Sequence, residues 1–277
     1  MTRSGCGIGK GLLEAGLIAL ALLFLFPFYL TLVNGMKPYD EMARSLLAFP
    51  RAPELKNFAA VWEKLNYPRS FLNSLSVTAA SVAGILLASA ACAYQLVRRP
   101  GRISSAIFYS ILASMIIPFQ TVMVPLVVVA KELGLVDTLH GVILIYCGFS
   151  LPMAVFLYHG FIKAIPRELE EAAHIDGSGT FGTFFRIVFP LLKPVTASVA
   201  VINALGIWND FMVPLLMIRS ESLRTIPLAS SIFYGVYKSD WNLAMAALTL
   251  GMLPVVVFFL FMQRFIVQGI VAGAVKT

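Results

Sequence analysis

Charged residues are scarce in this sequence. Only 13% of its 277 residues are charged and 59% are hydrophobic, whereas an ordinary soluble domain is about 25% charged. A mean hydropathy of +0.85 agrees with this composition, and together these values exclude a soluble globular domain and predict a polytopic membrane protein. The net charge is +7, but the basic residues are scattered among short loops without interleaved aromatic residues. We therefore expect membrane lipid as a partner and no nucleic acid.

Cysteine and histidine are also few and far apart. The sequence contains Cys6, Cys92, Cys147, His140, His159 and His174. The cysteines form no CxxC pair, and the histidines lack metal-ligand spacing with neighbouring acids. No nucleophile and base stand in a recognisable catalytic arrangement. We therefore predict a chain that is not itself an enzyme and that binds no metal or cofactor.

The N-terminal stretch Gly7–Lys10 falls short of a phosphate-binding loop. That motif needs glycine at position 4 and serine or threonine at position 11, where this sequence has Ser4 and Gly11. The chain thus has no ATPase motif, and any ATP hydrolysis is expected on separate partner subunits.

Six apolar runs are each about long enough to cross a bilayer as a helix. We place them at 11–33, 71–97, 104–130, 139–161, 187–217 and 243–265. The first run is longer than a signal-peptide core and lacks a small-residue cleavage site, so we expect it to be retained. Pro118 and Pro125 interrupt the third run. The predicted fold class is an all-α polytopic membrane protein with one transmembrane domain over 1–277.

Six spans would place both termini on the same side of the membrane. Arg98, Arg99 and Arg102 crowd the short loop on that side, whereas Lys131 stands alone on the short loop of the other side. The positive-inside rule therefore predicts cytoplasmic termini. The long outside loop is also basic, so this asymmetry alone supports the orientation only in part.

The longest polar passage in the second half of the chain runs from Glu168 to Pro190. Its acidic start suits a helix N-terminus, and Gly177 can adopt the left-handed conformation that ends a helix. For the first helix we expect an apolar face of Ile165, Leu169, Ala172 and Ala173, opposite Arg167, Glu170, Glu171 and His174. A second amphipathic helix is expected from Phe181, Phe184, Phe185 and Val188. This pair of helices predicts a docking element for another protein; the alternative is a loop that lies on the bilayer surface.

The same passage carries a specific pattern: Glu-Ala-Ala, three residues, glycine, nine residues, isoleucine, one residue, then Phe189-Pro190. It resembles the EAA loop of ABC importer permease subunits, in which leucine usually stands where this chain has Phe189. The resemblance implies that the loop 163–190 docks on a separate ATP-hydrolysing subunit and transmits its closure to the membrane helices. It assigns this coupling role to Glu171, Ala172, Ala173, Asp176, Gly177, Phe184, Ile187 and Pro190.

The resemblance extends over nearly the whole chain. Further matching stretches are Asn73-Ser74, Ile117-Pro118-Phe119-Gln120, Leu133-Gly134-Leu135-Val136-Asp137-Thr138, Trp208-Asn209-Asp210 and Gln263-Arg264-Phe265. In this order they resemble the smaller six-span permease of maltose-type sugar importers. That family implies a bacterial inner-membrane location, a second homologous permease chain as heterodimer partner, and two ATP-binding cassette subunits that hold ATP and Mg. It also implies an extracytoplasmic solute-binding protein and a sugar substrate.

One acidic residue, Asp210, lies clearly inside a predicted span. Pro214 cannot donate to the carbonyl of Asp210, and Gly206 loosens the preceding turn, so we expect a kinked or broken helix there. Asn209 or Asp210 would then cap the outer piece, and the freed polar backbone would line a cavity or a protein contact.

The residues considered for a translocation path or gate are Trp208, Asn209, Asp210, Gln120 and Asn203. Each has a structural alternative. Asp210 can act only as a helix cap, and Trp208 can be an interfacial anchor instead of stacking on a sugar ring. The amides of Gln120 and Asn203 can form interhelical hydrogen bonds instead of contacting a ligand.

Three classes of function remain open on these residues. The leading one is the translocation subunit of an ATP-driven sugar importer. The second is a stand-alone secondary transporter that uses Asp210 as its ion or proton site, and the third is a membrane scaffold that transports nothing. The docking loop favours the first, because a secondary carrier has no use for an ATPase-facing glycine hinge.

Overall fold

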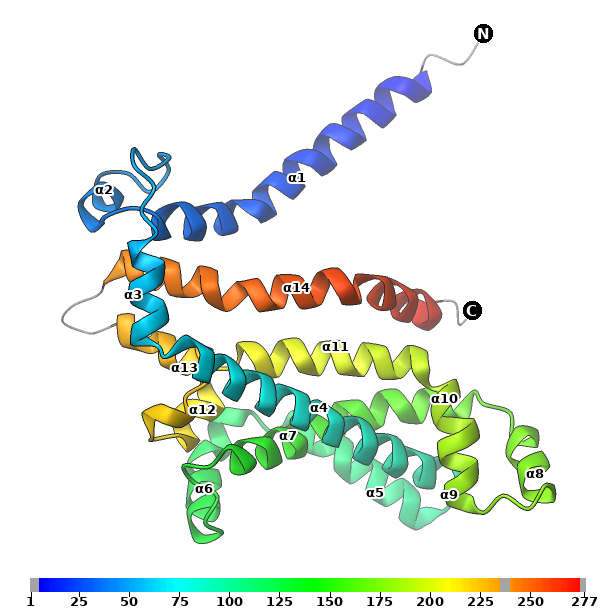
Figure 1. Ribbon diagram of the computed structural model, residues 1–277. Coiled ribbons are helices and arrows are strands. Elements are labelled where there is room, and N and C mark those ends of the chain that lie inside the picture. The colour runs from blue at the N-terminus through cyan, green and yellow to red at the C-terminus, as the bar shows by residue number, and fades with distance from the viewer. Residues whose placement is uncertain (1–4, 235–239, 275–277) are drawn as a thin grey trace. The chain divides into compact units, whose positions relative to one another are not determined.

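The computed structural model describes residues 5–234 and 240–274 of the chain, and all regular elements among them are helices (Figure 1). The chain divides into two compact units. The first consists of Met1–Tyr67 and Ser230–Pro254, and the second of Pro68–Ala229 and Val255–Thr277.

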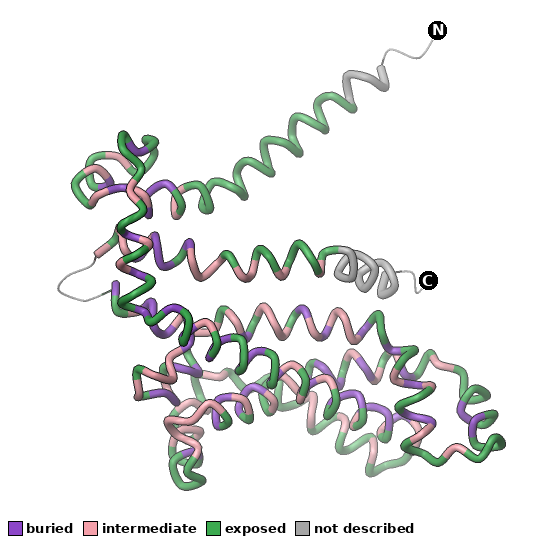
Figure 2. The backbone as a smooth tube through the Cα atoms, viewed as in Figure 1, coloured by how far each residue is buried: buried purple, intermediate pink, exposed green. Residues whose placement is uncertain are grey.

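The first unit contains α1 (Gly5–Gly35), α2 (Tyr39–Arg44), α3 (Lys56–Lys64), the 3-10 helix η4 (Ser231–Phe233) and the first part of α14 (Trp241–Ala274). Residues 10–29 of α1 are all exposed (Figure 2), as expected for an apolar helix meant for surroundings other than water. The other end of α1 approaches α14 closely. A Cβ on Gly35 would lie 3.0 Å from the backbone of Ala246, so a larger residue there would require the neighbouring backbone to shift.

A buried lysine closes the loop that follows α1. Lys37 is fully buried, and its Nζ donates to Asn34 Oδ1 at 3.0 Å and to the Ser45 carbonyl at 2.9 Å. Burial lowers the pKa of the Lys37 ammonium, and the Glu41 carboxylate partly opposes this shift. Asn57 adds bonds from its Nδ2 to the carbonyls of residues 35 and 37. These bonds satisfy polar groups that would otherwise be costly to bury.

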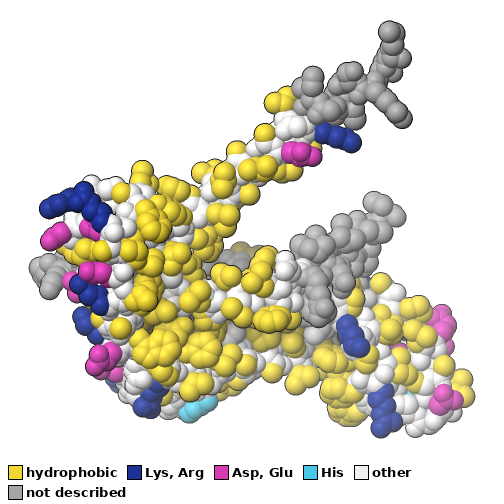
Figure 3. Space-filling view, turned by 45° about the horizontal axis from the view of Figure 1, so that its top comes forward, with side chains coloured by type: hydrophobic (Ala, Val, Ile, Leu, Met, Phe, Trp, Pro, Cys, Tyr) yellow, Lys and Arg dark blue, Asp and Glu magenta, His cyan; other side chains and the backbone are white. Residues whose placement is uncertain are grey.

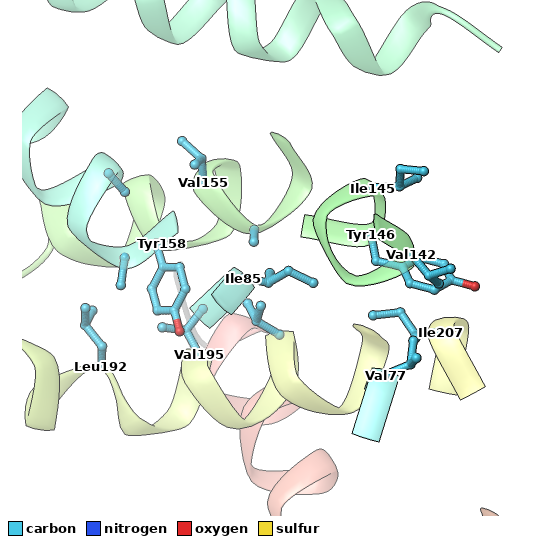
Figure 4. Close-up of a cluster of buried hydrophobic side chains, with 14 of the residues drawn as sticks. Val77, Ile85, Val142, Ile145, Tyr146, Val155, Tyr158, Leu192, Val195 and Ile207 are labelled. Carbon is cyan, nitrogen blue, oxygen red and sulfur yellow. The ribbon is translucent and has the colours of Figure 1, made fainter. Parts of the chain in front are cut away.

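The helices of the second unit pack around α7 (Leu139–Lys163), which contacts α5 (Arg102–Ala113), α11 (Lys193–Asn209) and α12 (Met212–Met217). The core joins α7 to α4 (Tyr67–Arg98) and α11, as Ile85, Tyr158 and Val195 illustrate (Figure 4). The Tyr158 hydroxyl donates to Thr196 Oγ1 at 3.0 Å, so the one polar atom of this large buried side chain is paired. The remaining elements are η1 (Ser114–Ile116), α6 (Phe119–Glu132), α8 (Glu168–Ile175), α9 (Thr180–Thr183), η2 (Phe184–Val188), α10 (Phe189–Leu191), η3 (Glu221–Leu223) and α13 (Ile226–Ser230).

Among the described residues, four helices are long and apolar enough to cross a membrane: Lys10–Gly35, Tyr67–Arg98, Leu139–Lys163 and Trp241–Gln263. They correspond to the first, second, fourth and sixth runs expected from the sequence. The count reaches six only if each of two bent helix pairs is one span. The exact number of six crossings therefore stays a prediction.

The third expected span, 104–130, is not straight. Arg102–Ile116 and Phe119–Glu132 meet at an angle of 105°. The physical cause is Pro118, which cannot donate to the helix ladder and holds the residue before it, Ile117, in an extended conformation with ψ 117°. Pro125 was expected to interrupt the span as well, but it lies inside α6 without ending that helix.

The fifth expected span, 187–217, is not one straight helix either. The chain bends by 76° between Thr180–Leu191 and Lys193–Asn209. It breaks again between Asn209 and Met212, where α11 ends and α12 begins. The sequence predicts this second break but not the first bend.

Labelling of introduced cysteines tests whether the bent pair of α5 and α6 crosses the membrane. The native cysteines are first replaced. Ala48→Cys is then expected to react with an impermeant maleimide from outside, and Glu168→Cys only from inside. The reason is that three membrane crossings separate the exposed positions 48 and 168. Reaction of both from the same side would show that the bent pair does not cross and that the six-span topology is wrong.

Candidate functional site

The predicted docking loop folds as two short helical segments on either side of one glycine. Helix α8 carries Glu168, Glu170 and Glu171 in its first turn, where the helix dipole favours negative charge. Gly177 follows with φ +82°, and the N–H of Ser178 bonds back to the carbonyl of Ala173 at 2.9 Å. The left-handed glycine turn expected from the sequence is therefore present.

The turn presents large apolar side chains on its outer surface. Ile175 is 87% exposed and Phe181 is 83% exposed, one on each side of Gly177. Figure 3 shows hydrophobic, acidic and basic side chains interleaved at the end of the second unit that carries α8 and α9. Exposed apolar residues ringed by charge are typical of a surface that binds another protein.

The buried face of α8 differs from the one expected. Leu169 and Ala172 are exposed, whereas Glu170 and Ala173 are buried. The assignment of Glu170 to the solvent face was wrong because its carboxylate has partners elsewhere in the fold. Its Oε2 accepts from the Tyr94 hydroxyl at 2.8 Å, and its Oε1 accepts from Arg98 Nε at 2.6 Å.

A π-helix connects the loop to α11. It spans Phe184–Val188, between α9 and α10, and single π-helical turns are frequent at functional sites. Phe184 and Val188 point into the core, and Leu192 is buried at the 76° bend. These packed side chains connect the loop to α11.

The eight predicted coupling residues lie on this one segment. Glu171, Ala172, Asp176, Gly177 and Pro190 are exposed, Ile187 is half-buried, and Ala173 and Phe184 are buried. The exposed members lie on the surface and the buried members pack inside the fold, and the coupling role of all eight stays a prediction.

At the other break, Asp210 caps α12. Its carboxylate accepts from the N–H groups of Met212 at 3.2 Å and Val213 at 3.0 Å. The buried Tyr146 hydroxyl of α7 donates to the same carboxylate at 2.8 Å. Of the two caps that the sequence leaves open, Asp210 is the one observed, whereas Asn209 Nδ2 bonds back to the Leu205 carbonyl.

The other path candidates lie apart from this carboxylate. Asn203 Nδ2 donates to the Val199 carbonyl in its own helix, and within the described part of the chain Asn203 forms no interhelical hydrogen bond. Trp208 contacts the Phe71 ring edge-on, with ring centroids 5.8 Å apart. Gln120 is exposed in the first turn of α6. The structure thus brings together Asp210 and Tyr146, the latter of which sequence reasoning missed.

Asp137 is a second residue whose role the sequence did not reveal. It has φ +60°, and its Oδ1 accepts from the N–H groups of Arg219 and Ser220 at 2.9 and 2.8 Å. The Ser220 hydroxyl donates to its other oxygen, and this bond, together with the two backbone bonds, lowers the pKa of the Asp137 carboxyl. These bonds to Asp137, in the loop before α7, therefore hold the segment that follows α12 against that loop. The only sequence signal for this role was the position of Asp137 in the Leu133–Thr138 motif.

No cluster of three or more His, Cys, Asp or Glu side chains that could hold a metal ion is found in the part of the chain that the structure describes.

The described part of the chain is all-helical and apolar, with bent helix pairs and a two-helix polar loop. Known structures share this fold. A chain of a bacterial ABC transporter involved in the import of the acidic polysaccharide alginate matches with a TM-score of 0.80 and 20% identity, over 95% of this chain and 98% of that one. A chain of a bacterial alginate ABC transporter in complex with an alginate pentasaccharide-bound periplasmic protein matches with a TM-score of 0.65 and 17% identity, over 95% and 96%.

Sequence comparison gives the family. Residues 80–272 match the model for the binding-protein-dependent transport system inner membrane component. The chain is 42% identical over 260 residues to the probable starch degradation products transport system permease protein AmyC of Thermoanaerobacterium thermosulfurigenes, with 94% of each chain covered. It is 37% identical to the melibiose/raffinose/stachyose import permease protein MelC of Bacillus subtilis, covering 90% of this chain and 91% of the relative. The chain belongs to this family of permease components, which confirms the resemblance read from its motifs.

Proposed function

We propose that this chain is a translocation subunit of an ATP-driven importer and that the loop 163–190 couples it to a separate ATPase. The observation that carries this proposal is the exposed apolar pair Ile175 and Phe181, held on either side of a left-handed glycine. Burial of these two side chains in a groove of a partner protein is favourable, whereas their exposure to water is not. We expect the chain itself to contribute no catalytic group, and ATP and Mg would be bound by the partner ATPase subunits.

The two halves of the loop differ in structure, and we assign them different roles in transmitting movement. Helix α8 and the turn at Gly177 form the part to which a partner binds. The π-helix and the 76° bend at Leu192 then pass movement to α11. Since packed cores transmit strain and do not absorb it, closure of the ATPase pair would tilt α11 and the broken region at Asp210.

The substrate we propose is a sugar or oligosaccharide. Several relatives are named for such cargo: starch degradation products, melibiose, raffinose and stachyose, and, at 35% identity, the multiple sugar-binding transport system permease protein MsmG of Streptococcus mutans. The structural match at 20% identity is an alginate importer. A common carbohydrate chemistry across these relatives favours the same class of cargo here.

The assembly we propose contains a second homologous permease, two ATPase subunits and an extracytoplasmic solute-binding protein. The family description refers to a binding protein and to the inner membrane. We place both termini in the cytoplasm, because Arg98, Arg99 and Arg102 lie at the end of α4 and just after it, on the side that also carries the docking loop.

A secondary transporter that uses Asp210 is the alternative. The structure disfavours it, because the Asp210 carboxylate already accepts three hydrogen bonds, from Met212, Val213 and Tyr146. A carboxylate with these three bonds is suited to a structural role, in which it caps α12 and links that helix to α7.

Replacing the exposed apolar pair tests the docking role. Ile175→Asp combined with Phe181→Asp is expected to reduce the co-purifying ATPase by about tenfold or more, since each buried apolar anchor contributes roughly 1.5–3 kcal/mol. The folded permease should be recovered in normal amount, because both side chains are exposed. The measurement is the ratio of ATPase to permease after affinity purification.

The matched control is Leu133→Asp, which changes an apolar residue of similar exposure outside the loop. It should leave the ATPase ratio unchanged. Normal ATPase recovery by the double variant would contradict the docking assignment.

A further inference from the structure

The docking loop is tied to a helix that lies far from it in sequence. Arg98, the last residue of α4, donates from Nε and Nη2 to Glu170 Oε1, each at 2.6 Å. Its Nη2 also donates to the Ile165 carbonyl at 3.0 Å, just before α8 begins. Tyr94, one turn earlier on α4, donates to Glu170 Oε2 at 2.8 Å. Both oxygens of this carboxylate are therefore held by α4.

The ion pair is largely removed from water. The side chains of Arg98 and Glu170 are only 12% and 9% exposed, although Glu168 and Glu171 on the same helix are exposed. A buried pair contributes little net stability, because desolvation offsets the attraction, but it fixes geometry, since breaking it leaves an unpaired charge. Its value here is positional: α8 cannot move away from the end of α4 at low cost.

Tyr94 reaches the second half of the loop as well. Its ring lies 5.0 Å from the ring of Phe184, the first residue of the π-helix. The same side chain thus contacts Glu170 through its hydroxyl and Phe184 through its ring. Both halves of the docking loop are packed on the end of α4.

The opposite end of α4 holds the segment that follows α12. Asn73 Nδ2 donates to the carbonyls of Ser222 at 3.0 Å and Arg224 at 3.1 Å. The Ser74 hydroxyl accepts from the N–H of Ile226 at 2.9 Å. Figure 1 shows α4 running from the region of α12 and α13 to the end that carries α8 and α9.

We propose that Tyr94, Arg98 and Glu170 are positioning residues that clamp the docking loop to α4, and that α4 carries the loop's movement to the segment 218–226. A helix of 32 residues is about 48 Å long, enough to connect the two faces of a bilayer. Continuous backbone hydrogen bonding makes it a stiff connection. This inference rests on the proposed function, because it assumes that an ATPase moves the loop.

A reporter in the outer segment tests the connection directly. Glu221 is exposed there, so Glu221→Cys is placed in a chain whose three native cysteines are replaced by alanine. The complete complex is reconstituted in proteoliposomes, and its labelling rate by an impermeant maleimide is measured with and without a non-hydrolysable ATP analogue and Mg. We expect the nucleotide to change this rate by about fivefold or more, as for other couplings between distant sites.

Breaking the clamp should abolish that response. Glu170→Gln removes the charge but keeps the shape, and Tyr94→Phe removes one hydroxyl without disturbing the ring contact, so it remains informative if the first variant folds poorly. Both are expected to bind the ATPase while the labelling rate no longer responds to nucleotide. The matched control is Glu168→Gln, an exposed glutamate of the same helix, which should respond normally. The reversed pair Arg98→Glu with Glu170→Arg is expected to restore part of the response.

Two results would overturn the proposal: no nucleotide response in the unmodified clamp, or an unchanged response in both Glu170→Gln and Tyr94→Phe. Sugar uptake in the same proteoliposomes separates the two levels of the argument. A nucleotide response without sugar uptake would refute the proposed cargo and leave the clamp intact. Uptake with an unresponsive reporter would refute the clamp alone.

Discussion

Gly177→Val is expected to abolish sugar uptake, or to reduce it by more than tenfold, while the permease still folds. Gly177 has φ +82°, and a valine there costs roughly 1–2 kcal/mol in the left-handed region. No heavy atom lies within 4 Å of an added Cβ, so the cost arises from the backbone and not from a clash. The loop is expected to avoid this backbone cost by adopting a different turn, which changes the directions in which Ile175 and Phe181 point. The measurement is uptake by the reconstituted complex together with its ATPase rate.

Gly179→Val is the matched control. Gly179 stands two residues further on in the same loop with φ −74°, which valine adopts freely, and its Cβ would also meet no neighbour. This variant should keep most of the uptake. Equal uptake by Gly177→Val and the wild type would contradict the requirement for a left-handed turn.

The second large effect is expected at Asp210. Asp210→Leu removes the acceptor for the N–H groups of Met212 and Val213 and for the Tyr146 hydroxyl. A buried donor left unsatisfied costs about 1–3 kcal/mol, so the break between α11 and α12 should lose its shape and uptake should fail. Asp210→Asn keeps a capping oxygen without the charge and should retain substantial uptake.

Tyr146→Phe separates capping from the link to α7. It removes only the hydrogen bond across to α7, whereas the two bonds to the backbone of α12 remain. We expect a partial loss of uptake with normal assembly. If Asp210→Asn lost accumulation as completely as Asp210→Leu, the charge itself would be required, and the secondary-carrier alternative would gain the support that it now lacks.

Local chemistry explains what could be predicted from the sequence. The turn after α8 could be predicted because Gly177 readily adopts the left-handed conformation that ends a helix. The break at Asp210 could be predicted because Gly206 and Pro214 both disfavour a continuous helix there. Such features depend on a few neighbouring residues, so their sequence signals are strong. Pro118 likewise signals an interruption, but the 105° angle depends on what α5 and α6 pack against.

The features that escaped prediction depend on distant partners. Helical periodicity placed Glu170 on the solvent face, because a buried carboxylate is unexpected unless its partner is known. That partner, Arg98, lies 72 positions away and had been used only as a topological signal. Asp137 and Tyr146 escaped for the same reason, since their partners lie 83 and 64 positions away.

Uptake into proteoliposomes tests the central claim most directly. The permease is reconstituted with its co-purifying subunits and binding protein, with ATP and Mg trapped on the docking-loop side and no ion gradient. The account predicts that labelled oligosaccharide accumulates, that a protonophore has no effect, and that accumulation requires hydrolysable ATP. Failure to accumulate under these conditions, with uptake restored by an imposed proton gradient, would contradict it.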